Sequence, residues 1–302
     1  MTHPLGELRA LETDDGSLSL HSAHFGEAFH SSSGALAEAI AKFVRPAELD
    51  RFSQADELKV LDVCFGLGYN SAALMSALPC TNAPQMLWWG LELDQRPLTR
   101  ALDHKPFCDL WPPAVLNRLE QLRRTGSWND CAGQGTMAWG DARLNLKGLP
   151  DSCKPDLVLL DAFSPSRCPQ LWSEEFLAGL TDRLAPGGRL LTYCTAAAVR
   201  SSLRRAGLEL RSLLTAAHKL EKWSSGTLAA KQSEKGSLAV EGPGWTALSA
   251  MEEEHLQTRA SVPYRDPDGE DEAGMIQHRR KLEQDCCDLE STSAWQRRWR
   301  DH

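Results

Sequence analysis

The feature that most constrains the fold is a glycine-rich turn between an apolar segment and a helical one. The apolar segment Val60–Cys64 runs into Phe-Gly-Leu-Gly, which contains Gly66 and Gly68. Glycine lets the backbone turn sharply and approach a ligand closely, because no Cβ stands in the way. The residue three past Gly68 is Ser71, so the third glycine of a dinucleotide fingerprint is missing. The turn predicts a strand–turn–helix unit that faces a ligand. The missing third glycine makes a dinucleotide a less favoured ligand.

Apolar segments and helical patterns alternate from Leu58 onward, which predicts an α/β fold with a mostly parallel sheet covered on both faces. Helices are expected near residues 70–78, 97–102, 112–124, 174–184 and 196–206. Segments Leu208–Leu214 and Thr227–Ala230 should close the sheet as an antiparallel pair. The expected parallel strands are Lys59–Cys64, Met86–Glu92, Thr136–Trp139, Asp156–Leu160 and Arg189–Cys194.

The chain divides into three predicted parts. Residues 1–46 should form a hairpin near 13–31 and a helix over 33–44 with Ser33 as N-cap, packed on the main domain. Residues 47–230 hold the Rossmann-like sheet. Residues 231–302 are acidic and poor in aliphatic side chains, which predicts a loosely packed, partly disordered tail with one helix near 270–284. Trp295 and Trp299 are expected to dock on the body of the protein rather than on a nucleic acid.

The net charge of −8 is unevenly distributed. Residues 187–235 carry nine Lys/Arg and three Asp/Glu, whereas residues 251–290 carry five basic and twelve acidic side chains. The first stretch could contact a polyanion, or its arginines could be the solvated face of a helix and a strand. The sequence leaves both interpretations open for Arg200, Arg204, Arg205 and Arg211.

The composition also limits where the protein works. No apolar run approaches the roughly 20 residues that span a bilayer. The first seven residues lack the basic and apolar regions of a signal peptide. The nine cysteines form no Cys-x-x-Cys pair, and no metal-ligand spacing occurs. We therefore expect a cytoplasmic protein without a membrane partner or a metal.

Three carboxylates follow predicted strands and should meet at one edge of the sheet, where such sheets bind ligands. Glu92 can accept both hydroxyls of a ribose, with Asp94 as a helix N-cap. Asp141 can receive an adenine amino group, although alone it reads as a turn residue. Asp161 can hydrogen-bond an attacking amine, orient its lone pair and accept its proton, or it can cap a loop.

Four stretches of the chain resemble the methyltransferase domain of the bacterial MnmC family. They are residues 24–31, 64–70, 161–172 and 190–200, and the third, with its Asp-x-Phe-x-Pro and later Pro-x-x-Trp, is the most specific. The family methylates the aminomethyl group on the wobble uridine of certain tRNAs, with S-adenosylmethionine as the methyl donor. The resemblance covers about residues 13–230 and implies a class I S-adenosylmethionine-dependent methyltransferase with tRNA as its partner.

The resemblance also implies roles for individual residues, with residues 25–31 as a lid over the cofactor pocket. The implied catalytic residues are Asp161, Phe163 and Pro165. The implied substrate-binding residues are His30, Ser31, Trp172, Tyr193 and Arg200, with further phosphate contacts along Arg200–Arg211 and Lys219–Lys222. The implied cofactor-binding residues are Asp62, Phe65, Gly66, Gly68, Asn70, Glu92, Asp141 and Asp161.

Two departures from the family stand out. Leu67 replaces the usual threonine of the cofactor turn, so one polar contact to the methionine moiety is missing or comes from the backbone. The chain is also too short for the flavin-dependent oxidoreductase half of two-domain members, so we expect no FAD. Two alternatives remain open: a transferase of similar fold acting on a small amine, as polyamine synthases do, and a non-catalytic RNA-binding protein.

Overall fold

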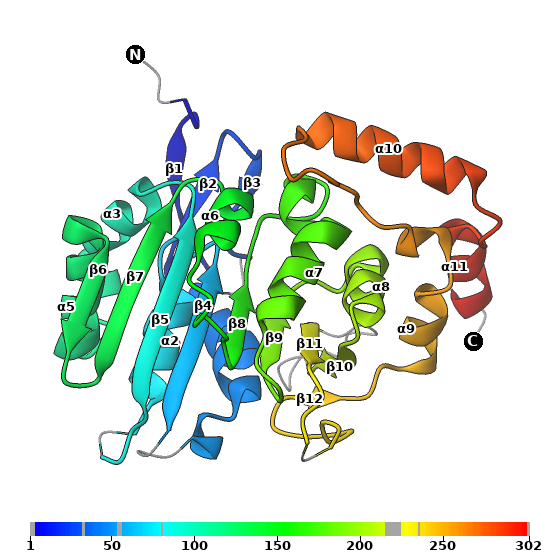
Figure 1. Cartoon of the computed structure of the whole chain (residues 1–302). Helices are drawn as coiled ribbons and strands as arrows, with labels where there is room; N and C mark the ends of the chain where they lie inside the picture. Colours follow the sequence, from blue (N-terminus) through cyan, green and yellow to red (C-terminus); the bar gives the residue numbers. More distant parts are fainter. Residues whose placement is uncertain are drawn as a thin grey trace.

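A computed structural model describes residues 4–31, 34–52, 56–79, 81–214, 225–234 and 236–300. Within these residues lies a nine-stranded sheet of order β12-β10-β11-β9-β8-β4-β5-β7-β6 (Figure 1). The central strands β9, β8, β4, β5 and β7 are parallel, and antiparallel strands flank them. The strands are β4 (Glu57–Val63), β5 (Gln85–Glu92), β6 (Ser127–Asp130), β7 (Gly133–Trp139), β8 (Leu157–Leu160), β9 (Arg189–Thr192), β10 (Glu209–Leu213), β11 (Gly226–Ala230) and β12 (Trp245–Thr246).

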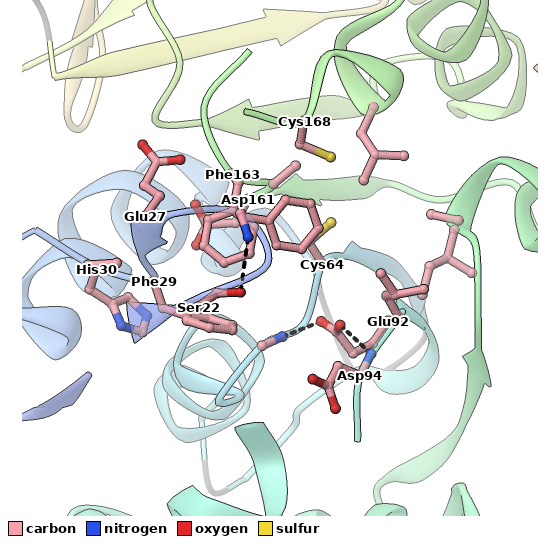
Figure 2. Close-up of a pocket in the computed structure, with 18 of the residues that line it drawn as sticks. Ser22, Glu27, Phe29, His30, Cys64, Glu92, Asp94, Asp161, Phe163 and Cys168 are labelled. Atoms are coloured by element: carbon pink, nitrogen blue, oxygen red, sulfur yellow. Dashed lines mark hydrogen bonds between the residues drawn. The ribbon is translucent and has the colours of Figure 1, made fainter. Parts of the chain in front are cut away.

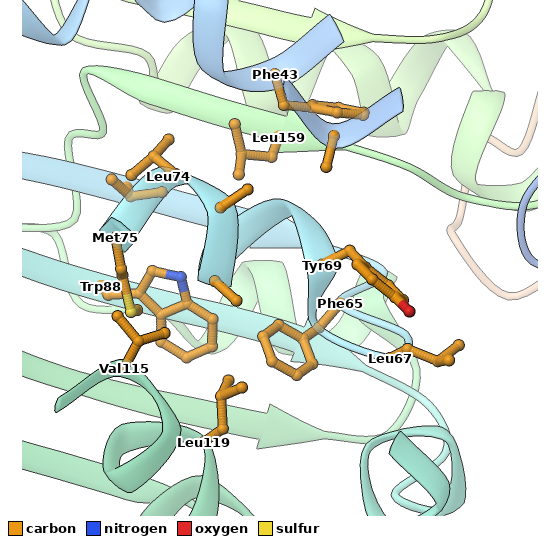
Figure 3. Packing of buried hydrophobic residues seen from close by; sticks show 14 of the residues in the cluster. Phe43, Phe65, Leu67, Tyr69, Leu74, Met75, Trp88, Val115, Leu119 and Leu159 are labelled. Carbon is orange, nitrogen blue, oxygen red and sulfur yellow. The ribbon is translucent and has the colours of Figure 1, made fainter. Parts of the chain in front are cut away.

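Side chains alternate across β4 and divide the core in two. Leu58 and Val60 face one layer, whereas Leu61 and Val63 face the other, as the two-residue period of a strand requires. The first layer packs the strands on α2 and α5 around Trp88 (Figure 3). The second layer packs them on α6, α7 and α8. The helices are α2 (Tyr69–Ala77), α3 (Arg96–Leu102), α4 (Lys105–Cys108), α5 (Pro113–Thr125), α6 (Ala142–Gly148), α7 (Glu174–Arg183) and α8 (Ala197–Arg205).

The N-terminal part forms a small sheet of order β1-β2-β3. Its strands are β1 (Leu8–Glu12), β2 (Leu18–Ser22) and β3 (Glu27–Ala28). The predicted helix over 33–44 is α1 (Ala35–Ala39) followed by a π-helical turn, η1 (Ile40–Val44), and two 3₁₀ turns, η2 (Arg45–Ala47) and η3 (Leu49–Arg51). The predicted N-cap Ser33 lies outside the described residues.

The prediction of a loosely packed, partly disordered tail is wrong for the described residues after 230. This segment adds β12 to the sheet and contains α9 (Ala250–His255), η5 (Arg259–Ser261), α10 (Ala273–Cys286) and α11 (Thr292–Arg300). Ile276 and Trp295 are buried, and Trp295 stacks on His255 with ring centroids 4.6 Å apart. Few apolar side chains suffice here, because acidic residues of the segment pair with arginines of α8.

The α/β fold class is confirmed, and the predicted parallel strands lie within a few residues of the observed ones. Strand β6 was missed because its pairing with β7 places only Trp128 of its four residues in the core. The boundaries of the three predicted parts remain predictions. Among the described residues, no helix has both the length and the apolar character needed to cross a membrane.

Candidate active site

A cavity of about 520 Å³ lies at the carboxyl edge of the parallel strands, beneath β2, β3 and α1 (Figure 2). Its floor comes from the turns after β4 and β5, and its sides from the turns after β7 and β8. The segment His24–Ser31 lies over it, so the lid predicted for residues 25–31 lines the cavity. This volume falls within the range of pockets that enclose a small molecule.

The glycine turn shapes one wall of this cavity. Gly66 has a φ of 57°, and a Cβ there would lie 3.2 Å from the Phe29 ring of the lid. Gly68 has a φ of 94°, but its missing Cβ leaves room for the Phe65 ring, which would be 2.7 Å away. Phe65 itself packs edge-on against Trp88. Gly66 therefore lines the cavity, whereas Phe65 packs beneath the turn and Gly68 lies outside the lining, and cofactor contacts at these two residues stay predictions.

Asp62 supports the turn from behind. It is fully buried, accepts a 2.5 Å hydrogen bond from the Ser71 hydroxyl, and does not line the cavity. Burial raises its pKa to about 7, although the Ser71 hydrogen bond opposes the shift. The carboxylate lies in the core between β4 and α2, and the cofactor contact at Asp62 stays a prediction.

Glu92 ends β5 with both carboxylate oxygens fixed by backbone donors. Oε2 accepts from the Gly66 amide at 2.8 Å, and Oε1 accepts from the Asp94 amide at 2.9 Å (Figure 2). Burial raises its pKa, although these hydrogen bonds favour the charged form. A carboxylate oxygen has two lone pairs, so Glu92 can still accept from hydroxyl groups in the cavity.

Asp141 caps α6 on the next wall. Its Oδ1 accepts from the backbone amide of Arg143 at 2.8 Å, and the Arg143 guanidinium donates to both carboxylate oxygens. Burial disfavours the charged form, but these hydrogen bonds outweigh it and lower the pKa of Asp141. A charged carboxylate is therefore held at the cavity, as the sequence predicted for the end of β7.

Asp161 follows β8 and lines the cavity beside Phe163 (Figure 2). Its Oδ2 accepts a 2.7 Å hydrogen bond from the Asn70 side-chain amide, at the start of α2. Burial raises its pKa to about 6, against the opposing effect of the Asn70 hydrogen bond. The turns after β4 and β8 thus meet at a carboxylate that titrates near neutral pH.

The lid and the Asp161 loop are joined by aromatic and polar contacts. The Phe25 ring stacks on Phe163 with centroids 4.4 Å apart, and the Phe29 ring contacts it edge-on at 4.9 Å. Oε2 of Glu27 accepts a 2.8 Å hydrogen bond from the Ser164 amide. Sequence reasoning did not single out Glu27, because only the folded lid brings it to this loop.

His30, Ser31 and Tyr193 line the cavity where the sequence placed substrate contacts. Burial lowers the pKa of His30 to about 4, so its imidazole is neutral at pH 7. Ser31 donates to Glu38, which also pairs with Lys42 at 2.9 Å. Glu38 and Lys42 line the cavity too and were missed, although their four-residue spacing on a helix was a readable signal.

Three predicted site residues do not line the cavity. Trp172 is buried, and its indole donates to the Phe163 carbonyl at 2.7 Å, so it supports the loop from behind. Pro165 does not line the cavity. Arg200 is 1 % exposed, with its guanidinium 2.9 Å from Glu252 and bonded to the Thr227 hydroxyl. Arg200 therefore cannot contact a phosphate, because the C-terminal segment covers and neutralises it.

The other arginines of this stretch are also paired. Arg204 forms a two-pronged contact with Glu253, Arg205 pairs with Glu174, and Arg211 pairs with Glu209. The described arginines of the predicted phosphate-binding stretch are thus paired within the protein, and Lys219 and Lys222 lie outside the described residues. The described residues contain no group of three or more His, Cys, Asp or Glu side chains that could hold a metal ion.

The chain is similar to known proteins in part of its sequence and in its fold. Residues 111–229 match the family described as S-adenosyl-L-methionine-dependent methyltransferase. The structure of MnmC2 from Aquifex aeolicus is similar over 95% of this chain and 88% of that chain, with a TM-score of 0.76 and 26% identity. This chain is an S-adenosylmethionine-dependent methyltransferase, similar in fold to MnmC2.

Similarity in sequence covers a smaller part of longer proteins. The methyltransferase is 31% identical over 204 residues to the tRNA 5-methylaminomethyl-2-thiouridine biosynthesis bifunctional protein MnmC of Caulobacter sp., which covers 63% of this chain and 33% of that protein. It is 31% identical over 199 residues to an uncharacterized protein of Methanocaldococcus jannaschii, covering 64% of this chain and 52% of that protein. The match thus spans between a third and about half the length of these relatives.

Proposed function

We propose that this methyltransferase acts on the aminomethyl group of a wobble uridine in tRNA, converting 5-aminomethyl- to 5-methylaminomethyl-(2-thio)uridine. The observation that carries the proposal is Asp161, a carboxylate with a pKa of about 6 that lines the cavity next to the cofactor turn. The Caulobacter relative is named for biosynthesis of this nucleoside, which supports the choice of substrate.

The cavity walls fit S-adenosylmethionine in this reading. Glu92 would receive the ribose hydroxyls, since it faces the cavity with lone pairs left after two backbone hydrogen bonds. Asp141 would receive the adenine amino group. Gly66 would allow the methionine moiety to pass close to the backbone, with Asn70 beside it. When bound, the cofactor supplies an electrophilic methyl group on sulfur.

Asp161 would hold the substrate amine in line with that methyl group. An amine attacks only as the neutral base, and a carboxylate with a pKa near 6 is ionised at pH 7 and can accept a proton from it. Asn70 keeps one carboxylate oxygen turned toward the cofactor turn, so the other can face the amine. Phe163, held between Phe25 and Phe29, would form an apolar wall at the reacting atoms.

The tRNA would approach from the side of the Asp161 loop. Arg167 is exposed on this loop, and its guanidinium lies beside Gly26 of the lid. Within the part of the chain that the structure describes, we find no ion pair for this side chain. A free guanidinium at the cavity rim suits a backbone phosphate next to the modified nucleotide.

The test is a methylation assay. Purified protein is incubated with S-adenosylmethionine and tRNA that carries 5-aminomethyluridine, and the digested nucleosides are weighed by mass spectrometry. We expect a gain of one methyl group on that nucleoside, and a loss of about 10²- to 10⁴-fold in rate for Asp161→Asn. tRNA that lacks the aminomethyl group is the substrate control.

The proposal fails if the aminomethyl nucleoside gains no methyl group while the protein still binds the cofactor. Methylation of free small amines at the same rate as tRNA would instead favour the small-amine transferase.

A further inference from the structure

Arg143 connects the cavity wall to the C-terminal segment of the chain. Its Nε and Nη2 face Asp141, with Nη2 2.7 Å from Oδ2. Its Nη1 donates to Asp266 Oδ2 at 2.7 Å and to the Asp271 carbonyl at 3.0 Å. All three guanidinium nitrogens are therefore used, and the edge that does not reach Asp141 is anchored in residues 266–271.

Asp266 is built to be immobile. It is 0% exposed, and its Oδ1 accepts from the backbone amides of Glu270 and Asp271 at 3.1 and 3.0 Å. Its own amide donates to Glu175 of α7 at 2.7 Å. Burying a charged carboxylate this completely costs free energy unless it is paired and hydrogen-bonded, and Arg143 is the charged partner of Asp266.

The helix cap alone leaves half of the Asp141 carboxylate unfixed. The backbone amide of Arg143 holds only Oδ1, at 2.8 Å. Oδ2 is oriented by the Arg143 side chain, and that side chain keeps its position through Asp266.

We propose that Asp266 is a positioning residue for the cofactor: by anchoring Arg143, it fixes the Asp141 carboxylate where it receives the adenine amino group. This inference rests on the adenine role proposed for Asp141. It assigns a part in cofactor selection to the segment after residue 230, which lies beyond the residues that match the methyltransferase family.

The preference for an adenine ligand over a hypoxanthine ligand can test this inference, because a general loss of stability would not change that preference. A fixed carboxylate accepts a hydrogen bond from the 6-amino group of adenine but faces the 6-oxo group of hypoxanthine, which is also an acceptor. A well-oriented Asp141 should therefore favour the adenine ligand, and a loosely held one should distinguish the two less.

The experiment measures binding of S-adenosylhomocysteine and S-inosylhomocysteine by calorimetry. We expect the wild-type protein to prefer the adenosyl ligand by at least about tenfold, the size of one hydrogen bond to a charged group. In Asp266→Asn, the adenosyl ligand should bind about tenfold more weakly and the inosyl ligand about as before. The matched control is Glu252→Gln, which removes another buried carboxylate of the same segment, paired with Arg200 away from the cavity; it should keep the wild-type ratio.

The inference is overturned if Asp266→Asn leaves the ratio of the adenosyl and inosyl affinities unchanged, which includes weakening both ligands by the same factor. It is also overturned if Glu252→Gln narrows that affinity ratio equally. Should Asp266→Asn fail to fold, Arg143→Lys serves instead, because an ammonium cannot span both carboxylates, and it should lose the preference likewise. A wild-type protein that binds both ligands equally refutes the adenine role of Asp141 and this inference together. The tRNA methylation assay tests the proposed substrate independently of these binding measurements.

Discussion

Asn70 and Asp161 lie 91 residues apart in sequence and are joined by a 2.7 Å hydrogen bond from the Asn70 amide to the Asp161 carboxylate. The bond links the first turn of α2, beside the glycine turn, to the loop after β8. It also favours the charged form of Asp161, against the burial that raises its pKa to about 6. One contact therefore affects both the place and the protonation of the proposed catalytic carboxylate.

Removing this contact should change the pH dependence of methyl transfer. The rate should rise with pH through about 6 as Asp161 ionises. In Asn70→Ala the acid limb should move up by about one pH unit, because a hydrogen bond to the charged form is lost. The check is kcat at saturating cofactor and tRNA from pH 5 to 9. An acid limb at the same pH in both proteins would refute the link between the two residues.

Asp62 should make the protein less stable as pH rises. Its folded-state pKa of about 7 lies above the ordinary value of 3.8, so the folded state binds the proton more tightly. The stability it contributes is present below about pH 4 and is lost as pH rises through 7. Asp62→Asn should remove this part of the pH dependence. The difference in unfolding free energy between Asp62→Asn and the wild-type protein should therefore be a few kcal/mol larger at pH 8 than at pH 4. Urea denaturation at the two pH values measures it, and equal differences would contradict the prediction.

Arg167 should matter for tRNA, whereas Arg204 should not. Arg167→Glu places a negative charge at the cavity rim and should raise KM for tRNA about tenfold at low salt, with a flatter salt dependence. The cofactor affinity should stay unchanged. Arg204→Glu is the matched control, because Arg204 is also exposed but pairs with Glu253. Equal effects of the two substitutions would show that overall charge, and not the rim position, governs binding.

The buried pair of Arg200 and Glu252 should stabilise the fold without touching the reaction. Glu252→Gln removes a counter-charge from a guanidinium that is 1 % exposed, which should lower the unfolding free energy by about 3–5 kcal/mol. Below the melting temperature, KM for tRNA should match the wild type. A selective rise in that KM would restore the phosphate-binding role that the sequence predicted for Arg200.

The strands and the three cavity carboxylates were predictable because the signals are local. Apolar runs mark β4, β5 and β8, and in a parallel sheet the residues that follow them must meet at one edge, so Glu92, Asp141 and Asp161 could be placed together. The burial of Arg200 was not predictable, since its partner lies 52 residues away in a segment whose composition suggested disorder. The same holds for Arg143 and Asp266, 123 residues apart.

The residues in the stretches that resemble the family show a second limit to prediction from sequence. Trp172 and Phe65 belong to stretches that resemble the family, yet both support the cavity from behind. A shared motif marks residues that a site requires, and it does not separate those that touch a ligand from those that hold the touching residues in place.

The pairing of α8 with the C-terminal segment bears on what counts as one folding unit. A chain cut after residue 230 would keep each strand-end carboxylate of the cavity. It would also lose Glu252, which pairs with Arg200, and Asp266, which anchors Arg143. The edge of β10 that pairs with β12 would be exposed. The region that supplies the cavity residues is therefore smaller than the region that holds them in place. A chain cut at the C-terminal end of the family match would retain the cavity residues and lose the contacts that anchor Arg143 and cover Arg200.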